Sequence, residues 1–239
     1  MTGTAEVLKR LREMADPANV AGMARFGMTA ERRMGVHVPD MRKLAREIGK
    51  DHALALELWR TGIPEARIMA GMIGEPDRLT EAEMEEWVAD FDSWDVCDQV
   101  CMNLFDKSPL AWKKVRDWSG REEEFVRRAA FALIACLAVH DREAEDERFV
   151  RFFPLIEGAA TDERNFVKKA VNWALRHIGK RNLRLNRSAL ELARKIHGID
   201  SRSARWIASD AIRELESEAV LTRLQKRGRT SVKNRKKTG

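Results

Sequence analysis

The stretch FDSWDVCDQV, residues 91–100, places a carboxylate beside an aromatic ring at a spacing that can support chemistry. In a helix, Trp94 and Asp98 stand four residues apart and share one face. Asp98 lies past the first turn and is flanked by valines and by Cys97 and Cys101. A carboxylate on a mostly apolar helix either pairs with an arginine or has a function. Asp98 is therefore the first candidate for a catalytic group.

The neighbouring polar residues have an ordinary structural role available. Asp92 or Ser93 can cap the helix, and Asp95 lies in the first turn, where the helix dipole stabilises a carboxylate. Trp94 would then be a packing residue. This interpretation accounts for Asp95, but it leaves Asp98 in need of a partner.

A metal site is the third interpretation of this stretch, because Cys97 and Cys101 stand four residues apart. Zinc sites use three or four ligands, often in CxxC or HExxH patterns. No histidine and no second cysteine pair lies nearby. We therefore expect no metal and no cofactor, and we expect both cysteines to be buried as small apolar residues. The histidines are scattered and form no pattern with serine or cysteine, so a nucleophilic triad is unsupported.

A second tryptophan lies among basic residues. In NFVKKAVNWALRHIG, residues 165–179, Trp173 follows Lys169 by four positions and precedes Arg176 by three. A tryptophan on such a face can stack on a base, a sugar or a cationic ring, and a core position is the alternative. Lys168 and Lys169 could supply a Schiff-base amine, but adjacent lysines at a helix start more often bind phosphate or face water.

The elements that must position these residues are helices. Apolar residues recur at helical spacing in most of the chain, and no segment alternates with period 2, which predicts an all-α fold. Thr80 and Glu83 form a capping-box pattern, and Gly49 and Gly62 end helical segments. The expected helices include residues 5–15, 39–49, 51–62, 80–91, 108–118 and 188–196.

Further helical segments resemble one another, which indicates a repeat. They cover residues 65–73, 125–138, 165–179 and 203–215. Each has one or two basic residues near its start, followed by small and apolar residues. Taking Arg67, Arg128, Lys169 and Arg205 as equivalent gives steps of 61, 41 and 36 residues, and the long first step leaves room for one more unit, around residues 94–98. Helix pairs repeating every ~40 residues predict a HEAT-like, armadillo-type solenoid.

If the second helix of each pair lines the concave side, the equivalent positions form a basic stripe. Such a stripe is typical of nucleic-acid binding. The alternative is that the stems pack between helices and the charged heads lie in solvent. The stripe comprises Arg67, Arg127, Arg128, Lys168, Lys169, Arg176, Lys180, Arg181 and Arg205.

The net charge of +6 is concentrated at the C-terminal end. Residues 221–239 hold eight basic residues and no acid; removing those eight from the 44 basic residues leaves 36 against 38 acidic residues. We expect a single repeat domain over 1–222, followed by a disordered basic tail over 223–239 that solubilises the chain or adds phosphate affinity. Three cysteines and no long apolar run favour a cytoplasmic protein without a membrane segment, and we expect a monomer.

At these same positions the chain resembles the AlkD-like DNA alkylation repair family, DNA glycosylases built from HEAT-like repeats. SWDVCD resembles the family's W-D-x-x-D motif, which implies that Asp98 is the catalytic carboxylate and Trp94 the aromatic wall of its pocket. FVRRAAF resembles the block with an arginine that contacts DNA, here Arg128. NFVKKAVNWALR resembles the block with the second tryptophan of the cleft, here Trp173. The resemblance covers residues 20–224.

The resemblance implies hydrolysis of the glycosidic bond of N3- and N7-alkylated purines in duplex DNA. The damaged base would stay stacked, without the extrusion that most base-excising enzymes use. No lysine adjoins Asp98 in sequence, which favours a monofunctional enzyme. The residues expected to bind the DNA backbone are Phe26, Arg67, Arg127, Lys168, Lys169, Arg176, Lys180 and Arg205. Members of the family can carry tyrosine where this chain has Phe26, so the hydroxyl's DNA contact is lost while the ring remains.

Two other functions are open on the sequence. Related subfamilies with this fold have lost the glycosylase residues and only bind damaged or branched DNA. A protein-interaction scaffold is the third possibility, but it has no need for a stripe of lysine and arginine. Retention of Trp94, Asp98, Arg128 and Trp173 favours the glycosylase.

Overall fold

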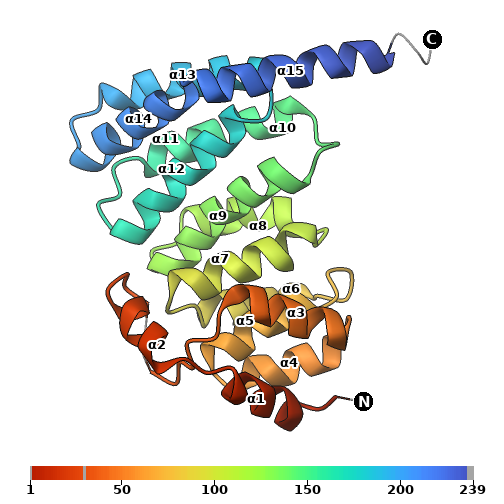
Figure 1. Cartoon of the computed structure of the whole chain (residues 1–239). Coiled ribbons are helices and arrows are strands. Elements are labelled where there is room, and N and C mark those ends of the chain that lie inside the picture. The colour runs from red at the N-terminus through yellow and green to blue at the C-terminus, as the bar shows by residue number, and fades with distance from the viewer. Residues whose placement is uncertain (1, 29–30, 236–239) are drawn as a thin grey trace. The chain divides into compact units, whose positions relative to one another are not determined.

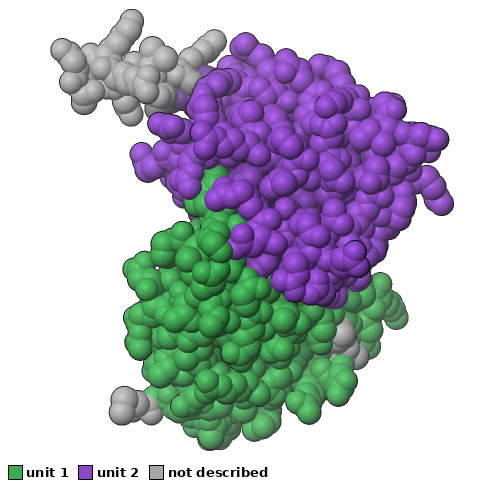
Figure 2. All heavy atoms as spheres, turned by 180° about the vertical axis from the view of Figure 1, so that it is seen from behind, with its two compact units in different colours: residues 1–114 green, residues 115–239 purple. Residues whose placement is uncertain are grey.

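The computed structural model describes residues 2–28 and 31–235, and side chains as far as Arg227. Within these residues every regular element is a helix, which confirms the all-α prediction (Figure 1). The chain divides into two compact units, residues 1–114 and 115–239, coloured separately in Figure 2. The division falls inside helix α8.

Short helices with defined starts and ends build the first unit. Asp51 accepts a hydrogen bond from the Leu54 N–H at 2.9 Å at the start of α4. Thr80 and Glu83 form the expected capping box at α6. Gly49, with φ +82°, ends α3. The helices are α1 (Thr4–Glu13), α2 (Pro17–Ala24), α3 (Val38–Ile48), α4 (His52–Arg60), α5 (Pro64–Ile73), α6 (Glu81–Ala89), α7 (Trp94–Asn103), the short 3-10 helix η1 (Phe105–Lys107) and α8 (Ala111–Ser119).

Stacked aromatic rings form much of the core of the first unit. Trp59 of α4 and Trp87 of α6 stack with ring centroids 4.1 Å apart and planes 1° from parallel. Phe91 and Phe105 lie against these rings, and all four side chains are buried. Burial assigns these tryptophans to packing and leaves Trp94 as a half-buried ring on α7.

Longer helices in two layers form the second unit. The helices α9, α12 and α14 pack side by side, while α11 and α13 cover them from one side (Figure 1). Small side chains along α9, mostly alanine, allow α12 to approach closely, and α9 is buried from Arg128 to Ala138. The helices are α9 (Glu124–His140), α10 (Asp146–Val150), α11 (Phe153–Ala159), α12 (Asn165–Gly179), α13 (Leu183–His197), α14 (Arg202–Leu215) and α15 (Glu218–Arg235).

The helix starts confirm the predicted repeat. The helices α5, α7, α9, α12 and α14 begin at residues 64, 94, 124, 165 and 202, so successive starts are 30, 30, 41 and 37 residues apart. The unit expected in the gap after Arg67 is α7. Asp98 is the fifth residue of α7, as Arg128 is of α9 and Lys169 of α12. An acid therefore occupies the position at which α9 and α12 carry a base.

The C-terminal segment is described as a helix over most of its length. The expected boundary between residues 222 and 223 falls within α15, which is anchored by buried Val220 and Leu224. Residues 236–239 of the expected tail lie outside the described residues. Among the described helices, none is long and apolar enough to cross a membrane.

Candidate active site and nucleic-acid interface

Helix α7 begins at Trp94, with Ser93 at the N-cap position as expected. The Ser93 hydroxyl does not cap the backbone; it donates a hydrogen bond to Asp95 at 2.5 Å. Asp95 lies in the first turn, where the helix dipole adds to the stabilisation of its negative charge. The predicted start of this helix is confirmed, but its polar groups are used for a different purpose.

That purpose is an ion pair with Arg33. Two guanidinium nitrogens of Arg33 donate to the two carboxylate oxygens of Asp95, at 2.6 and 3.1 Å. The Arg33 side chain is 1% exposed and that of Asp95 is 14% exposed. A bidentate pair of this kind fixes orientation as well as distance. Asp95 is thus committed to holding the segment that contains Arg33 against the start of α7.

A buried glutamate holds the same segment from its other side. Glu65, in the first turn of α5, accepts hydrogen bonds from the backbone N–H groups of Met34 and Gly35 at 3.0 and 2.8 Å. Gly35 has φ +79°, and a Cβ atom there would lie 2.2 Å from the carbonyl oxygen of Asp16. Only glycine fits this close approach. Residues 33–35, which precede α3, are therefore held against α5 and α7.

Phe26, two residues after the end of α2, lies next to Trp94. The Trp94 indole Nε1–H donates to the backbone carbonyl of Phe26 at 3.0 Å. The Phe26 ring is 71% exposed. Two residues that the sequence analysis selected separately are thus neighbours in the first unit. The hydrogen bond fixes the rotation of the indole ring.

Asp98 lies one turn after Trp94 on α7 and is half-buried. Cys97 and Cys101, on either side of it in sequence, are fully buried, as predicted from their apolar surroundings. Asp98 is therefore a carboxylate at the edge of an apolar surface, where its attraction for a nearby positive charge is stronger than in bulk water.

In the second unit, Arg128 is a buried residue of α9. One of its guanidinium nitrogens donates to the Phe166 carbonyl of α12 at 2.6 Å, and the side chain is almost covered, because the residue is 5% exposed. The rings of Phe125 and Phe166 stack beside it with centroids 5.5 Å apart. The position of this arginine is therefore set by the packing of α9 on α12.

Trp173 is half-buried on α12 and meets the edge of His177, with ring centroids 5.7 Å apart and planes at 85°. The pKa of His177 is lowered to about 3, first by burial and then by the charges of Lys180 and Arg176. The imidazole is therefore neutral at physiological pH. The neutral imidazole beside Trp173 therefore adds no charge to those of Lys180 and Arg176.

Most cations of the predicted stripe are held in ion pairs. Arg67 donates to the side chain of Asp90 at 2.7 Å and lies over the Trp59 ring. The other pairs join Arg127 to Asp162 at 3.3 Å, Arg176 to Glu214 at 2.5 Å, Lys180 to Glu214 at 2.7 Å and Arg205 to Asp200 at 2.9 Å. Burial raises the pKa of Glu214, but Lys180 and Arg176 outweigh it and the pKa is lowered overall. An acid therefore lies next to most of the cations of the stripe.

Lys168 and Lys169 differ from this pattern. The Lys168 ammonium lies 5.6 Å from the centre of the Trp206 ring, and Lys169 is exposed. Trp206 is itself 41% exposed. The sequence analysis did not select Trp206, although its position next to Arg205 in SARWIAS gives the signal that was used for Trp173.

The structure thus groups the predicted residues by unit. Phe26, Trp94 and Asp98 belong to one cluster in the first unit, and Arg67 lies apart from it on α5. The second unit holds the others on three adjacent helices: Arg127 and Arg128 on α9, Lys168, Lys169, Trp173 and Arg176 on α12 with Lys180 directly after it, and Arg205 on α14. Arg33 and Glu65, which position the first cluster, were not anticipated.

Comparisons with known proteins place this arrangement. A solved structure described as "A new family of proteins related to the HEAT-like repeat DNA glycosylases with affinity for branched DNA structures" is 18% identical, with a TM-score of 0.75 over 89% of this chain and 95% of that chain. A designed armadillo repeat protein is 14% identical, with a TM-score of 0.33 over 74% of this chain and 92% of that chain. No curated protein matches the sequence. The first likeness shows that the fold is the predicted HEAT-like helical repeat. A family model described as "DNA alkylation repair enzyme" matches residues 7–215, and the chain therefore belongs to the DNA alkylation repair enzyme family.

Proposed function

We propose that the protein is a monofunctional DNA glycosylase that hydrolyses the N-glycosidic bond of cationic N3- and N7-alkylated purines in duplex DNA. Asp98 is the catalytic carboxylate. Trp94 contacts the deoxyribose of the damaged nucleotide. Arg128, Trp173 and the basic residues on the helices named above act on the sugar and the phosphate backbone.

One observation carries this proposal: the two acids of SWDVCD have separate environments. Asp95 is engaged by Arg33 and Ser93 and is a structural anchor. Asp98 lies one turn further along the same helix, past the capping region, on the face that also carries Trp94. The Phe26 carbonyl fixes the Trp94 ring. The chain thus maintains an anchored aromatic ring next to a carboxylate that has no role in starting the helix.

The chemistry of the lesion explains why a carboxylate is suitable. An alkylated purine carries a positive charge, and when its bond to C1′ breaks, the base departs neutral and the charge moves to the deoxyribose. An ionised Asp98 near C1′ stabilises this oxocarbenium ion and can orient a water molecule. The water oxygen forms the new bond to C1′ and one of its protons is released. The face of Trp94 attracts the sugar more strongly as the sugar becomes cationic.

In this mechanism the leaving base supplies much of the selectivity. Neutral purines leave poorly, so an enzyme that stabilises only the sugar cation acts on bases that are already cationic. The base can then remain stacked while the protein contacts the sugar and the backbone. The exposed Phe26 ring, adjacent to Trp94, offers an apolar contact to the same sugar or its neighbour.

The test is the release of base from duplex DNA that contains N7-methylguanine or N3-methyladenine. The Asp98→Asn variant keeps the size of the side chain and removes its charge, and we expect release to fall about a hundredfold or more. Asp92→Asn, at an exposed acid of the same stretch, is the matched control and should release base like the wild type. Absence of release by the wild type, or equal release by Asp98→Asn, would contradict the assignment.

The alternative function is binding of damaged or branched DNA without catalysis. It is favoured by the solved structure with the same fold, whose description names affinity for branched DNA. A binding protein would show a higher affinity for a four-way junction than for a duplex and no base release. Asp98→Asn would then leave both measurements unchanged.

A further inference from the structure

A cavity of about 580 Å³ lies within the second unit, at the ends of α9 and α12 and beside α15. Basic side chains line most of its polar wall, and one acid, Asp146, also lies there. The basic side chains are Arg142, Lys180, Arg181, Arg223 and Arg227. The predicted stripe does not account for this group of basic side chains, because Arg142, Arg223 and Arg227 do not belong to it.

Two of these cations are part of the framework. The Arg181 guanidinium donates to the carbonyl oxygens of Ala138, Asp141 and Ala144 at 2.8, 2.9 and 3.1 Å. It therefore ties the loop after α9 to the end of α12. Lys180 is paired with Glu214. These two side chains shape the cavity and have little capacity left for a ligand.

The other three differ in their pairing. Arg142, Arg223 and Arg227 are exposed, and within residues 2–28 and 31–227 none of their guanidinium groups forms an ion pair or hydrogen bond. Some other exposed arginines of the unit are paired, for example Arg184 with Glu147 at 2.6 Å and Arg194 with Glu216 at 2.7 Å. The cavity thus gathers guanidinium groups that repel one another, and an anionic ligand relieves that repulsion.

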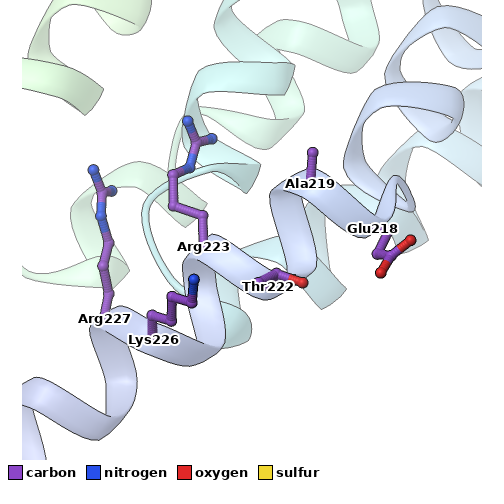
Figure 3. Close-up of a pocket in the computed structure, with 6 residues that line it drawn as sticks. All are labelled: Glu218, Ala219, Thr222, Arg223, Lys226 and Arg227. Carbon is purple, nitrogen blue, oxygen red and sulfur yellow. The ribbon is translucent and has the colours of Figure 1, made fainter.

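The arginines of α15 are held at a defined spacing. Arg223 and Arg227 stand one turn apart and extend from the same side of the helix (Figure 3). Leu224, 1% exposed, anchors the helix between them. Side chains at this helical spacing lie about 5–6 Å apart. Two guanidinium groups at this separation can each contact a different phosphate of a DNA strand.

We propose that this cavity binds phosphate groups of the DNA backbone, with Arg142, Arg223 and Arg227 as the contacting residues. This inference rests on the proposed function, since it takes duplex DNA as the ligand. Binding at this cavity is independent of base sequence, because contacts to phosphate oxygens carry no sequence information. It adds affinity through three arginines that do not belong to the stripe.

The experiment measures the affinity for undamaged duplex DNA over a range of salt concentrations. Each phosphate contact contributes about −0.9 to the slope of log K against log salt. The double variant Arg223→Gln/Arg227→Gln should reduce the magnitude of the slope by about two. The matched control is Arg187→Gln/Arg194→Gln on the exposed side of α13, which removes the same charge away from the cavity and should leave the slope near the wild-type value.

Three results would overturn the proposal. The slope could stay unchanged in the α15 variant, or it could fall equally in the control, which would assign the effect to net charge. Inorganic phosphate could raise the melting temperature of the wild type but not of the α15 variant, while the DNA slope is the same in both. That result would assign the cavity to free phosphate. Base release separates this proposal from the proposed function. Asp98→Asn should lose release and keep the wild-type slope, whereas the α15 variant should lower the slope.

Discussion

The two units use pairs of opposite charges for different purposes. In the first unit, Arg33 and Asp95 are 62 positions apart, and their pair holds a loop segment against the helix that carries Trp94 and Asp98. In the second unit, pairs such as Arg127–Asp162 and Arg176–Glu214 join neighbouring elements over 35 and 38 positions. The first kind of pair fixes geometry around the candidate catalytic residues. The second kind cancels charge along the helices expected to face DNA.

This difference changes how the basic stripe is understood. Most of its cations are paired with an acid, so the number of lysines and arginines overstates the attraction for a phosphate backbone. We expect affinity to depend more on exposed cations to which the described residues offer no acidic partner, such as Lys169, Arg223 and Arg227.

The largest effect is expected from Arg33→Met, which breaks the anchor of the first unit. The change leaves the Asp95 carboxylate without its bidentate partner in a site where that side chain is 14% exposed. Breaking a buried pair from one side costs about 3–5 kcal/mol. Urea denaturation should show this loss in the free energy of unfolding. Adding Asp95→Leu should recover most of it, and a loss below about 1 kcal/mol would show that the pair is not an anchor.

The second prediction concerns Gly35, at the other end of the same segment. Gly35→Ala forces a Cβ atom to within 2.2 Å of the Asp16 carbonyl oxygen in a left-handed backbone conformation. Gly49 has nearly the same φ, +82°, but a Cβ atom there meets nothing within 4 Å. Gly49→Ala should therefore lose only the cost of its positive-φ backbone conformation, about 1–3 kcal/mol, and Gly35→Ala clearly more. Equal losses in thermal unfolding would rule out a close approach at Gly35.

The third prediction uses the neutral histidine of the second unit. The pKa of His177 is lowered to about 3, mainly by burial and then by Lys180 and Arg176. Between that value and the ordinary 6.5, the unfolded chain binds a proton that the folded chain does not, so stability falls as pH falls through this window. From pH 7 to pH 5 the loss attributable to His177 should be about 1–2 kcal/mol.

The control for this prediction is a histidine with a different environment. His177→Gln should flatten the pH dependence of unfolding between pH 7 and pH 5, whereas His197→Gln, at an exposed position on α13, should not. If both variants keep the wild-type pH dependence, His177 binds protons equally in the folded and unfolded chains, which contradicts a pKa lowered by burial.

The sequence predicted the helices well because their signals are local. Thr80 and Glu83, Asp51 and Gly49 act on the backbone within a few residues, and apolar spacing set the buried faces. The repeat was also visible, since Arg128 and Lys169 mark the same turn of successive helices. The Trp94–Asp98 pair could be selected from the unusual chemistry of its spacing.

The remaining features depend on partners far apart in the chain. No local pattern indicates that Arg33 binds Asp95, or that Glu65 binds the backbone beside Gly35. The neutralising acids of the stripe were missed for the same reason, because Glu214 lies 38 positions after Arg176. A composition count treats such an acid as solvent-exposed charge, while packing of α12 on α14 makes it a partner.

The smallest expected effect, and the most direct test of charge cancellation, comes from Glu214→Gln. The lowered pKa of Glu214 keeps it ionised at neutral pH, because the charges of Lys180 and Arg176 outweigh the effect of burial. Removing its charge leaves Lys180 available to phosphate, while Arg176 keeps only its longer contact with Asp210, at 3.4 Å. Duplex affinity at low salt should therefore rise a few-fold, worth about 0.5–1 kcal/mol, with a steeper salt dependence. Glu216→Gln makes the same charge change beside Arg194, where both side chains are largely exposed. If the two variants gain equally, net charge explains the effect; a larger gain for Glu214→Gln shows that acids of the second unit restrain its cations.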